Sequence, residues 1–134
     1  PSNAAKFYKN AGTLNLTEGT LEVKSQCPSA SYNAIQISSG VTVNATKDHL
    51  TKLNASGENM YMDLNGKTLG KMTIANSGSY SVFARDNFTL LGNLTINGGG
   101  KLESMGSTGD ITLNGKNFVN NSTGTFDLNS SLRR

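Results

Sequence analysis

The 134-residue sequence lacks Trp altogether and has little Cys, Pro or aromatic content, with one Cys, two Pro and 7% aromatic residues. A single Cys excludes an internal disulfide, so Cys27 is expected to be a small buried residue. Charged residues make up only 16% of the chain, and the basic ones are scattered despite a net charge of +3. Nucleic-acid surfaces require clustered basic residues interleaved with aromatics, so we expect no nucleic-acid partner.

Long apolar runs are also missing. None approaches the roughly 20 residues that a membrane-spanning helix needs, so we expect no such span. The first four residues, Pro1-Ser2-Asn3-Ala4, resemble the remnant of a purification tag. We therefore expect a single domain over residues 5–134, which is a fragment of a larger exported protein.

Small polar residues take the place of the missing types, because Asn, Ser, Thr and Gly together supply 61 of the 134 residues. Such a weakly hydrophobic chain is a candidate for disorder. Disorder is excluded here because Pro is scarce and apolar residues recur in short alternating runs. Residues 13–16, 35–37 and 94–96 are examples, and Gly-, Asn- or Ser-rich stops follow them. Period-two alternation with such stops predicts β-strands and essentially no helix.

Two architectures use strands of this kind. Asn-Gly between alternating runs is a strong hairpin signal, so a β-sandwich adhesin domain is one alternative. The strands are short and no large aromatic anchors a sandwich core, which favours a right-handed parallel β-helix, a β-solenoid. Strand-then-Gly phrases end at Gly19, Gly40, Gly57, Gly78, Gly98 and Gly115, at intervals of 21, 17, 21, 20 and 17 residues. These intervals predict about six to seven coils, each rising by about 4.8 Å.

The expected core consists of the inward residue of each strand, stacked in rows. It comprises Leu14, Leu16, Leu21, Val23, Ile35, Ile37, Val41, Val43, Leu53, Met62, Leu64, Leu69, Met72, Ile74, Val82, Leu90, Leu94, Ile96, Leu102, Ile111, Leu113, Val119, Phe126 and Leu128.

One phrase resembles a known family. The segment 63–69, DLNGKTL, resembles a phrase common in pectin-lyase-like β-helix proteins of the bacterial cell surface. Residues 88–104, FTLLGNLTINGGGKLES, look like a coil of an autotransporter passenger domain, including the vacuolating-cytotoxin-like and haemagglutinin-like groups. The likeness covers roughly residues 11–130 and lies in composition and rhythm. It implies a secreted or surface location and a role in adhesion or toxin delivery.

Catalytic signatures are missing, because enzymes of this fold need clustered carboxylates with Arg or Lys, and the acids here are spread singly. If a site exists, we expect Asp63, Asp86 and Arg85 to meet on neighbouring coils. The alternative is that Asp63 is an outward strand residue and that Arg85 and Asp86 sit in a loop. Tyr61 and Tyr80 are further ligand candidates as part of an aromatic platform for sugar rings, against the alternative of core or corner packing.

His49 is the only histidine, and without companion Cys or His residues it is expected to be a loop residue and not a zinc ligand. Gly98-Gly99-Gly100 lacks the Lys-Ser/Thr of a phosphate loop and the Asp of a calcium repeat, so it predicts a wide corner. We therefore expect no metal and no cofactor.

The sequence as a whole favours a non-enzymatic structural or binding module that presents a rigid surface to a host-surface or glycan partner. The alternative is a fragment of a carbohydrate-active β-helix enzyme, a polysaccharide lyase or hydrolase. Self-association through the terminal coils is a third expectation, because the ends of a solenoid leave unpaired strand edges.

Overall fold

A computed structural model describes residues 7–24, 33–54, 57–77, 80–105, 111–114, 118–120 and 125–127. Within these ranges the chain forms β-strands and turns, with no helix, as the alternating pattern predicts. The expected tag remnant, Cys27, Gly78, Gly115 and Leu128 lie outside the described residues. None of the described segments is a helix long and apolar enough to cross a membrane.

The strands form four sheets. The six-stranded sheet contains, in spatial order, β1 (Phe7–Lys9), β4 (Ile35–Ile37), β7 (Met60–Asp63), β10 (Ser81–Ala84), β13 (Lys101–Ser104) and β16 (Thr125–Asp127). The five-stranded sheet contains β15 (Phe118–Asn120), β12 (Leu94–Ile96), β9 (Lys71–Ile74), β6 (Leu50–Leu53) and β3 (Thr20–Val23). The three-stranded sheet contains β14 (Ile111–Leu113), β11 (Phe88–Leu90) and β8 (Thr68–Leu69), and the two-stranded sheet contains β2 (Thr13–Leu16) and β5 (Thr42–Ala45).

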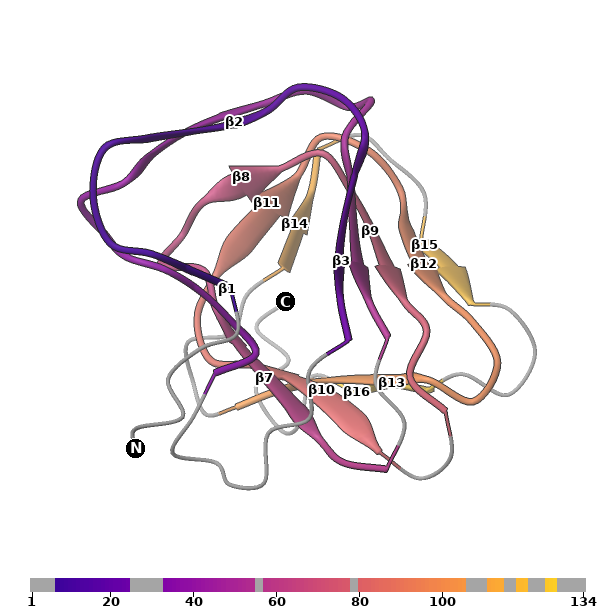
Figure 1. The fold of residues 1–134 in the computed structure, drawn as a ribbon. Helices are drawn as coiled ribbons and strands as arrows, with labels where there is room; N and C mark the ends of the chain where they lie inside the picture. The colour runs from indigo at the N-terminus through magenta and orange to yellow at the C-terminus, as the bar shows by residue number, and fades with distance from the viewer. Residues whose placement is uncertain are drawn as a thin grey trace.

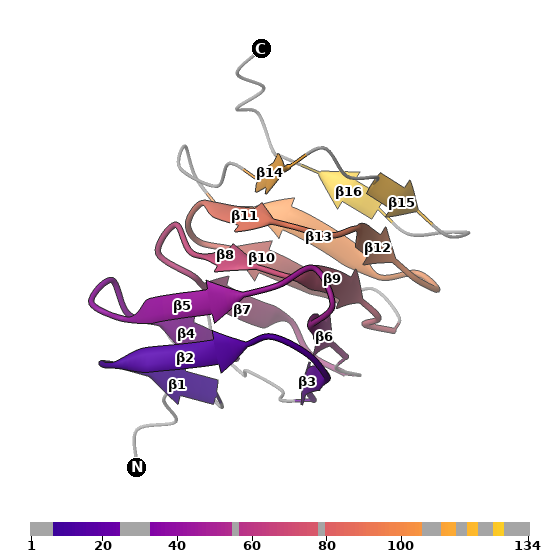
Figure 2. The same ribbon diagram turned by 90° about the horizontal axis from the view of Figure 1, so that it is seen from above.

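Every strand pairing in the described residues is parallel, and every pair joins strands that are three places apart in the chain. Strands of successive turns therefore lie side by side within each sheet. The sheets lie on three sides of a shared core (Figures 1 and 2). This arrangement is compatible with a β-solenoid. It is not the antiparallel sandwich that the Asn-Gly signals offered as an alternative.

The Asn65-Gly66 turn explains why an apparent hairpin signal does not make a hairpin. Both residues have positive φ, 47° and 71°, the conformation that Asn and Gly tolerate best. Here the turn joins β7 to β8, which belong to different sheets. The Asn65 side-chain Nδ2 donates to the carbonyl of Ile37 at 2.9 Å, so the same residue also ties its turn to the strand beneath.

Inward side chains form rows that cross the sheets. In the five-stranded sheet Leu53, Ile74 and Ile96 are in register and fully buried. Burying each such side chain contributes about 1.5–3 kcal/mol, which is the main stabilising term in a protein without cross-links. Most of the expected core residues are buried, and Met60, Phe88, Ala34 and Ala84 join them.

Some expected core residues are only half-buried, and all of them belong to strands near the two ends of the stack. They are Leu14, Leu21, Val43, Ile111, Leu113 and Val119. The inward assignment of Val119 is wrong, because the register places Phe118 beside buried Leu94 and Val119 beside Thr95 on the outward side. A strand has period two, so misplacing the pattern by one residue exchanges the two faces.

The spacing of the glycines does not measure the repeat. Gly19 lies between β2 and β3, Gly40 between β4 and β5, and Gly57 between β6 and β7, so these glycines mark different corners. Equivalent strands of the six-stranded sheet begin at residues 7, 35, 60, 81, 101 and 125, and successive starts are 20 to 28 residues apart. The predicted intervals of 17 residues are therefore too short, whereas those of 20 and 21 fall at the lower end of the observed range.

Candidate functional site

The outward face of the six-stranded sheet carries two neighbouring rows of side chains. The register places Tyr61, Phe83 and Glu103 in one row. Gln36 and Asp63 lie in the next row, where Arg85 follows directly after β10 and its backbone N–H donates to the Met62 carbonyl at 2.9 Å. Three of the site residues expected from the sequence, Asp63, Arg85 and Tyr61, are thus neighbours on one face.

The aromatic rings of this face are stacked. The Tyr61 and Phe83 ring centroids are 5.1 Å apart and the rings are inclined by 16°. The Arg85 guanidinium carbon lies 4.9 Å from the Tyr61 ring centroid, in cation–π geometry. Stacked aromatic pairs contribute about 0.5–1.5 kcal/mol beyond burial and a cation–π contact about 0.5–2 kcal/mol, so the three side chains support one another.

Tyr61 is the most buried of these three residues. Only 9% of its surface is exposed, whereas Phe83 and Arg85 are half-buried. The alternative of packing is therefore correct for Tyr61, and the accessible part of the expected platform consists of Phe83 and Arg85. Strand alternation alone misses this burial, because Tyr61 occupies an outward position.

Arg85 has unused hydrogen-bonding capacity. Its Nε and Nη2 atoms are buried and have no hydrogen-bond partner in the described structure. These two N–H groups form the edge of the guanidinium that binds oxyanions in a bidentate manner. Buried polar groups of this kind are usually satisfied, so an unsatisfied edge is a feature of functional interest.

Asp63 is the titratable residue most affected by this environment. Burial raises its pKa above the usual range, and the neighbouring Asp86 carboxylate raises it further. Hydrogen bonding from Asn65 and the charge of Arg85 oppose this rise. The Asp63 Oδ1 accepts from the Asn65 Nδ2 at 2.9 Å. Desolvation together with a like charge is a pattern found at functional sites, although structural networks share it.

Asp86 completes the expected trio. It lies in the turn after β10 next to Arg85, and its Oδ1 accepts from the backbone N–H of Asn87 at 2.7 Å. Asp63 is an outward strand residue and Arg85 and Asp86 are turn residues, as the alternative reading of the sequence held. Those positions nevertheless bring Arg85 and Asp86 close enough to Asp63 to affect its pKa.

Tyr80 lies apart from this group. It precedes β10 and is 38% exposed, whereas Arg85 follows the same strand. Five residues of extended chain span about 16 Å, which separates the Tyr80 backbone from that of Arg85. Tyr61 lies opposite Phe83 and is buried, whereas Tyr80 lies three residues before Phe83 and is exposed, so the two tyrosines do not form one exposed aromatic surface.

A second polar contact on this face was not expected from the sequence. The Ser81 hydroxyl donates to the Glu103 carboxylate, and the Ser81 backbone N–H donates to Asn59 Oδ1 at 2.9 Å. Ser81 and Phe83 share the outward side of β10, and Glu103 lies opposite Phe83 on β13. Neither residue belongs to a motif, so only the strand register reveals this pair.

His49 lies in the loop before β6, as expected, and it is buried, with 4% of its surface accessible. Its Nδ1 lies 3.0 Å from the Glu18 carbonyl oxygen of the preceding turn. The described residues contain no group of three or more His, Cys, Asp or Glu side chains able to hold a metal ion. His49 therefore acts as a packing and hydrogen-bonding residue between two turns.

Comparison with known proteins adds no family assignment to this geometry. No protein-family model matches the sequence, and no curated protein or solved structure matches the chain.

Proposed function

We propose that the chain is a stretch of right-handed parallel β-helix of six to seven coils, from a secreted or surface-exposed bacterial protein. Parallel pairing between strands three places apart and in-register apolar rows support this architecture. The resemblance of residues 63–69 and 88–104 to pectin-lyase-like surface proteins and autotransporter passengers agrees with it. In this proposal the module is non-enzymatic and presents a rigid surface to a host or glycan partner.

The packing of Tyr61, Phe83 and Arg85 on the six-stranded sheet is the observation that carries the binding role. A partly exposed aromatic ring offers a flat apolar surface to a sugar ring, and the guanidinium beside it donates hydrogen bonds to sugar oxygens. Because the Phe83 ring and the Arg85 guanidinium both pack against the buried Tyr61 ring, they are ordered before a ligand binds. Such preorganisation reduces the entropy lost on binding.

Glycan binding by the full chain, measured on an oligosaccharide panel and then by calorimetry, tests this proposal. Phe83→Ala and Arg85→Gln are each expected to weaken binding by 10-fold or more, as at a central contact residue. Thr95→Ala, an outward change on the five-stranded sheet, is the matched control and is expected to leave affinity unchanged. Absence of saturable binding to the panel contradicts the glycan role, and unchanged affinity in both variants contradicts the site.

A carbohydrate-active enzyme fragment is the second candidate, and the raised pKa of Asp63 is the observation that favours it. A carboxyl group that stays protonated longer than usual is suited to general acid catalysis, with Asp86 as the neighbouring carboxylate. Polysaccharide degradation by the full-length protein separates the two functions. Activity that is lost in Asp63→Asn or Asp86→Asn establishes the enzyme and overturns the non-enzymatic role.

We also propose self-association through the outermost described strands, supported by Phe118. This residue continues the row of Met72 and Leu94, yet it is 41% exposed. A second copy stacked on this end covers the ring and pairs the strand edge. Light scattering over a concentration series is expected to show growth in mass, and a constant monomer mass contradicts the idea.

A further inference from the structure

A hollow of about 260 Å³ lies at the corner where the ribbon enters the five-stranded sheet. It is lined by Lys47, Asp48, Lys71, Leu91, Gly92 and Asn93. Lys47 and Asp48 lie in the turn before β6, Lys71 is the first residue of β9, and the other three residues lie in the turn before β12. The corner lies across the core from the six-stranded sheet (Figure 1), so this site does not depend on the binding face described above.

Glycine keeps the hollow open. A Cβ atom at Gly92 would lie 2.5 Å from the Cγ of Lys71, and 3.4 Å from the carbonyl oxygens of Gly70 and Lys47. Any side chain at this position therefore displaces Lys71 from its place. Close packing of Lys71 over Gly92 fixes the lysine stem, because the stem lies against backbone instead of extending into solvent.

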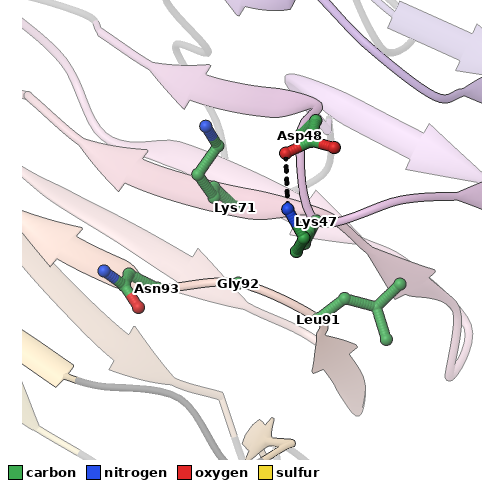
Figure 3. A pocket seen from close by; sticks show the side chains of 6 residues that line it. All are labelled: Lys47, Asp48, Lys71, Leu91, Gly92 and Asn93. Carbon is green, nitrogen blue, oxygen red and sulfur yellow. Dashed lines mark hydrogen bonds and ion pairs between the residues drawn. The ribbon is translucent and has the colours of Figure 1, made fainter.

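The charges around the hollow are unbalanced. Lys47 Nζ lies 3.0 Å from Asp48 Oδ1, and both side chains are mostly exposed, so this ion pair contributes little. The Lys71 ammonium group has no ion-pair or hydrogen-bond partner among the described residues. Figure 3 shows the Lys47–Asp48 pair on one side and the Lys71 and Asn93 side chains on the other. The six residues thus carry a net charge of +1.

We propose that this hollow binds a tetrahedral oxyanion, a sulfate or phosphate group. The donors are two ammonium groups and the Asn93 amide, which come from three successive segments of the chain that line the hollow. Lysine ammonium groups bind such anions as point charges from several directions, whereas a planar carboxylate is better matched by an arginine fork. The volume lies below the range of drug-sized ligand pockets, which suits a single anionic group.

Titration with sodium sulfate at constant ionic strength, followed by backbone NMR of the full chain, tests this site. We expect saturable shifts at Gly92 and Asn93, with no saturation at Lys101, an outward residue of the six-stranded sheet. Lys71→Gln is expected to weaken binding about three- to fivefold, as for removal of one partner of an exposed charge pair. Lys101→Gln is the matched control and should leave the affinity unchanged.

Two further variants distinguish a site from general salt effects. Gly92→Ala keeps every charge but displaces Lys71, so binding should weaken as it does in Lys71→Gln while the circular dichroism spectrum is retained. Asp48→Asn removes a like charge beside the anion and is expected to strengthen binding about threefold. Shifts that rise linearly with sulfate in the unchanged protein, or affinities of Lys71→Gln and Gly92→Ala that equal that of the unchanged protein, overturn the proposal.

The source of the anion is resolved by comparing inorganic sulfate, inorganic phosphate and a sulfated oligosaccharide at equal concentrations of anionic groups. Tighter binding of the oligosaccharide with the same shifted residues identifies a sulfate borne on a glycan. Equal affinity identifies the free ion. Oligosaccharide binding that perturbs only the six-stranded sheet, together with no saturation by either free ion, overturns the proposal.

Discussion

Replacement of Gly70 by Ala tests whether the turns pack as closely as described. A Cβ atom at this position would lie 2.3 Å from the carbonyl oxygens of both His49 and Thr46. Ordinary contact begins at 3.4 Å, so the backbone of one turn must move by about 1 Å. Neither oxygen belongs to a flexible side chain, and both already accept hydrogen bonds, from Lys71 N at 2.7 Å and His49 N at 3.3 Å.

The expected loss of stability follows from these contacts. Overpacking of a rigid site costs about 1–3 kcal/mol, and weakening of two backbone hydrogen bonds costs about 0.5–1.5 kcal/mol each. We therefore expect Gly70→Ala to lower the free energy of unfolding by about 2–6 kcal/mol, a large part of the usual 5–15 kcal/mol. Urea denaturation followed by circular dichroism measures this loss, because the chain has no Trp to report by fluorescence.

Gly40→Ala is the matched control for this experiment. No atom lies within 4 Å of a Cβ at Gly40, and its φ is not in the left-handed region. This change is expected to be neutral or to stabilise by about 0.4–1 kcal/mol, because Ala restricts the unfolded chain. Equal urea midpoints for the two variants would refute the close approach of the turns at residues 46–49 and 70.

Three further predictions address the core and the two perturbed carboxyl groups. Ile74→Ala is expected to cost about 2–5 kcal/mol in urea denaturation, because Ile74 is fully buried, whereas Thr95→Ala should change stability by less than about 0.5 kcal/mol. Hydrogen bonds from Asn54 and Lys52 lower the pKa of Glu22 to about 2 from 4.5. Its stabilising contribution is therefore present above pH 4.5 and lost as the pH falls toward 2, and thermal melts of Glu22→Gln should lack this component. For Asp63, NMR titration should show a raised pKa that falls in Asp86→Asn, since a like charge is removed; an unchanged value would contradict their proximity.

The strand content and the parallel stacking follow from the sequence because they depend on local patterns. Alternation at Leu94 and Ile96 fixes both the strand and its buried side, and both residues are fully buried. Short strands without a large aromatic anchor also favoured stacking over a sandwich. The repeat length could not be predicted in the same way, because glycine is required at several different corners and does not identify any one of them.

Part of the candidate site could be predicted from the sequence. Asp63, Arg85 and Asp86 do come together, because residues about 22 positions apart meet on adjacent strands. The roles of Tyr61 and Tyr80 depend on what covers each outward position, which alternation does not encode. Likewise, the hollow lined by Lys71 and Gly92 depends on the contact between Gly92 and the lysine stem, and no sequence motif indicates it.

The pairing of each strand with those three places away makes the chain a linear series of neighbours. A residue in β9 bonds only to β6 and β12, so it gains nothing directly from more distant turns. Damage at one turn should therefore divide the column into two shorter segments that unfold separately, and fraying should advance from the outermost strands inward. A larger number of turns therefore protects the central strands from fraying, because each added turn moves the middle of the stack further from an end.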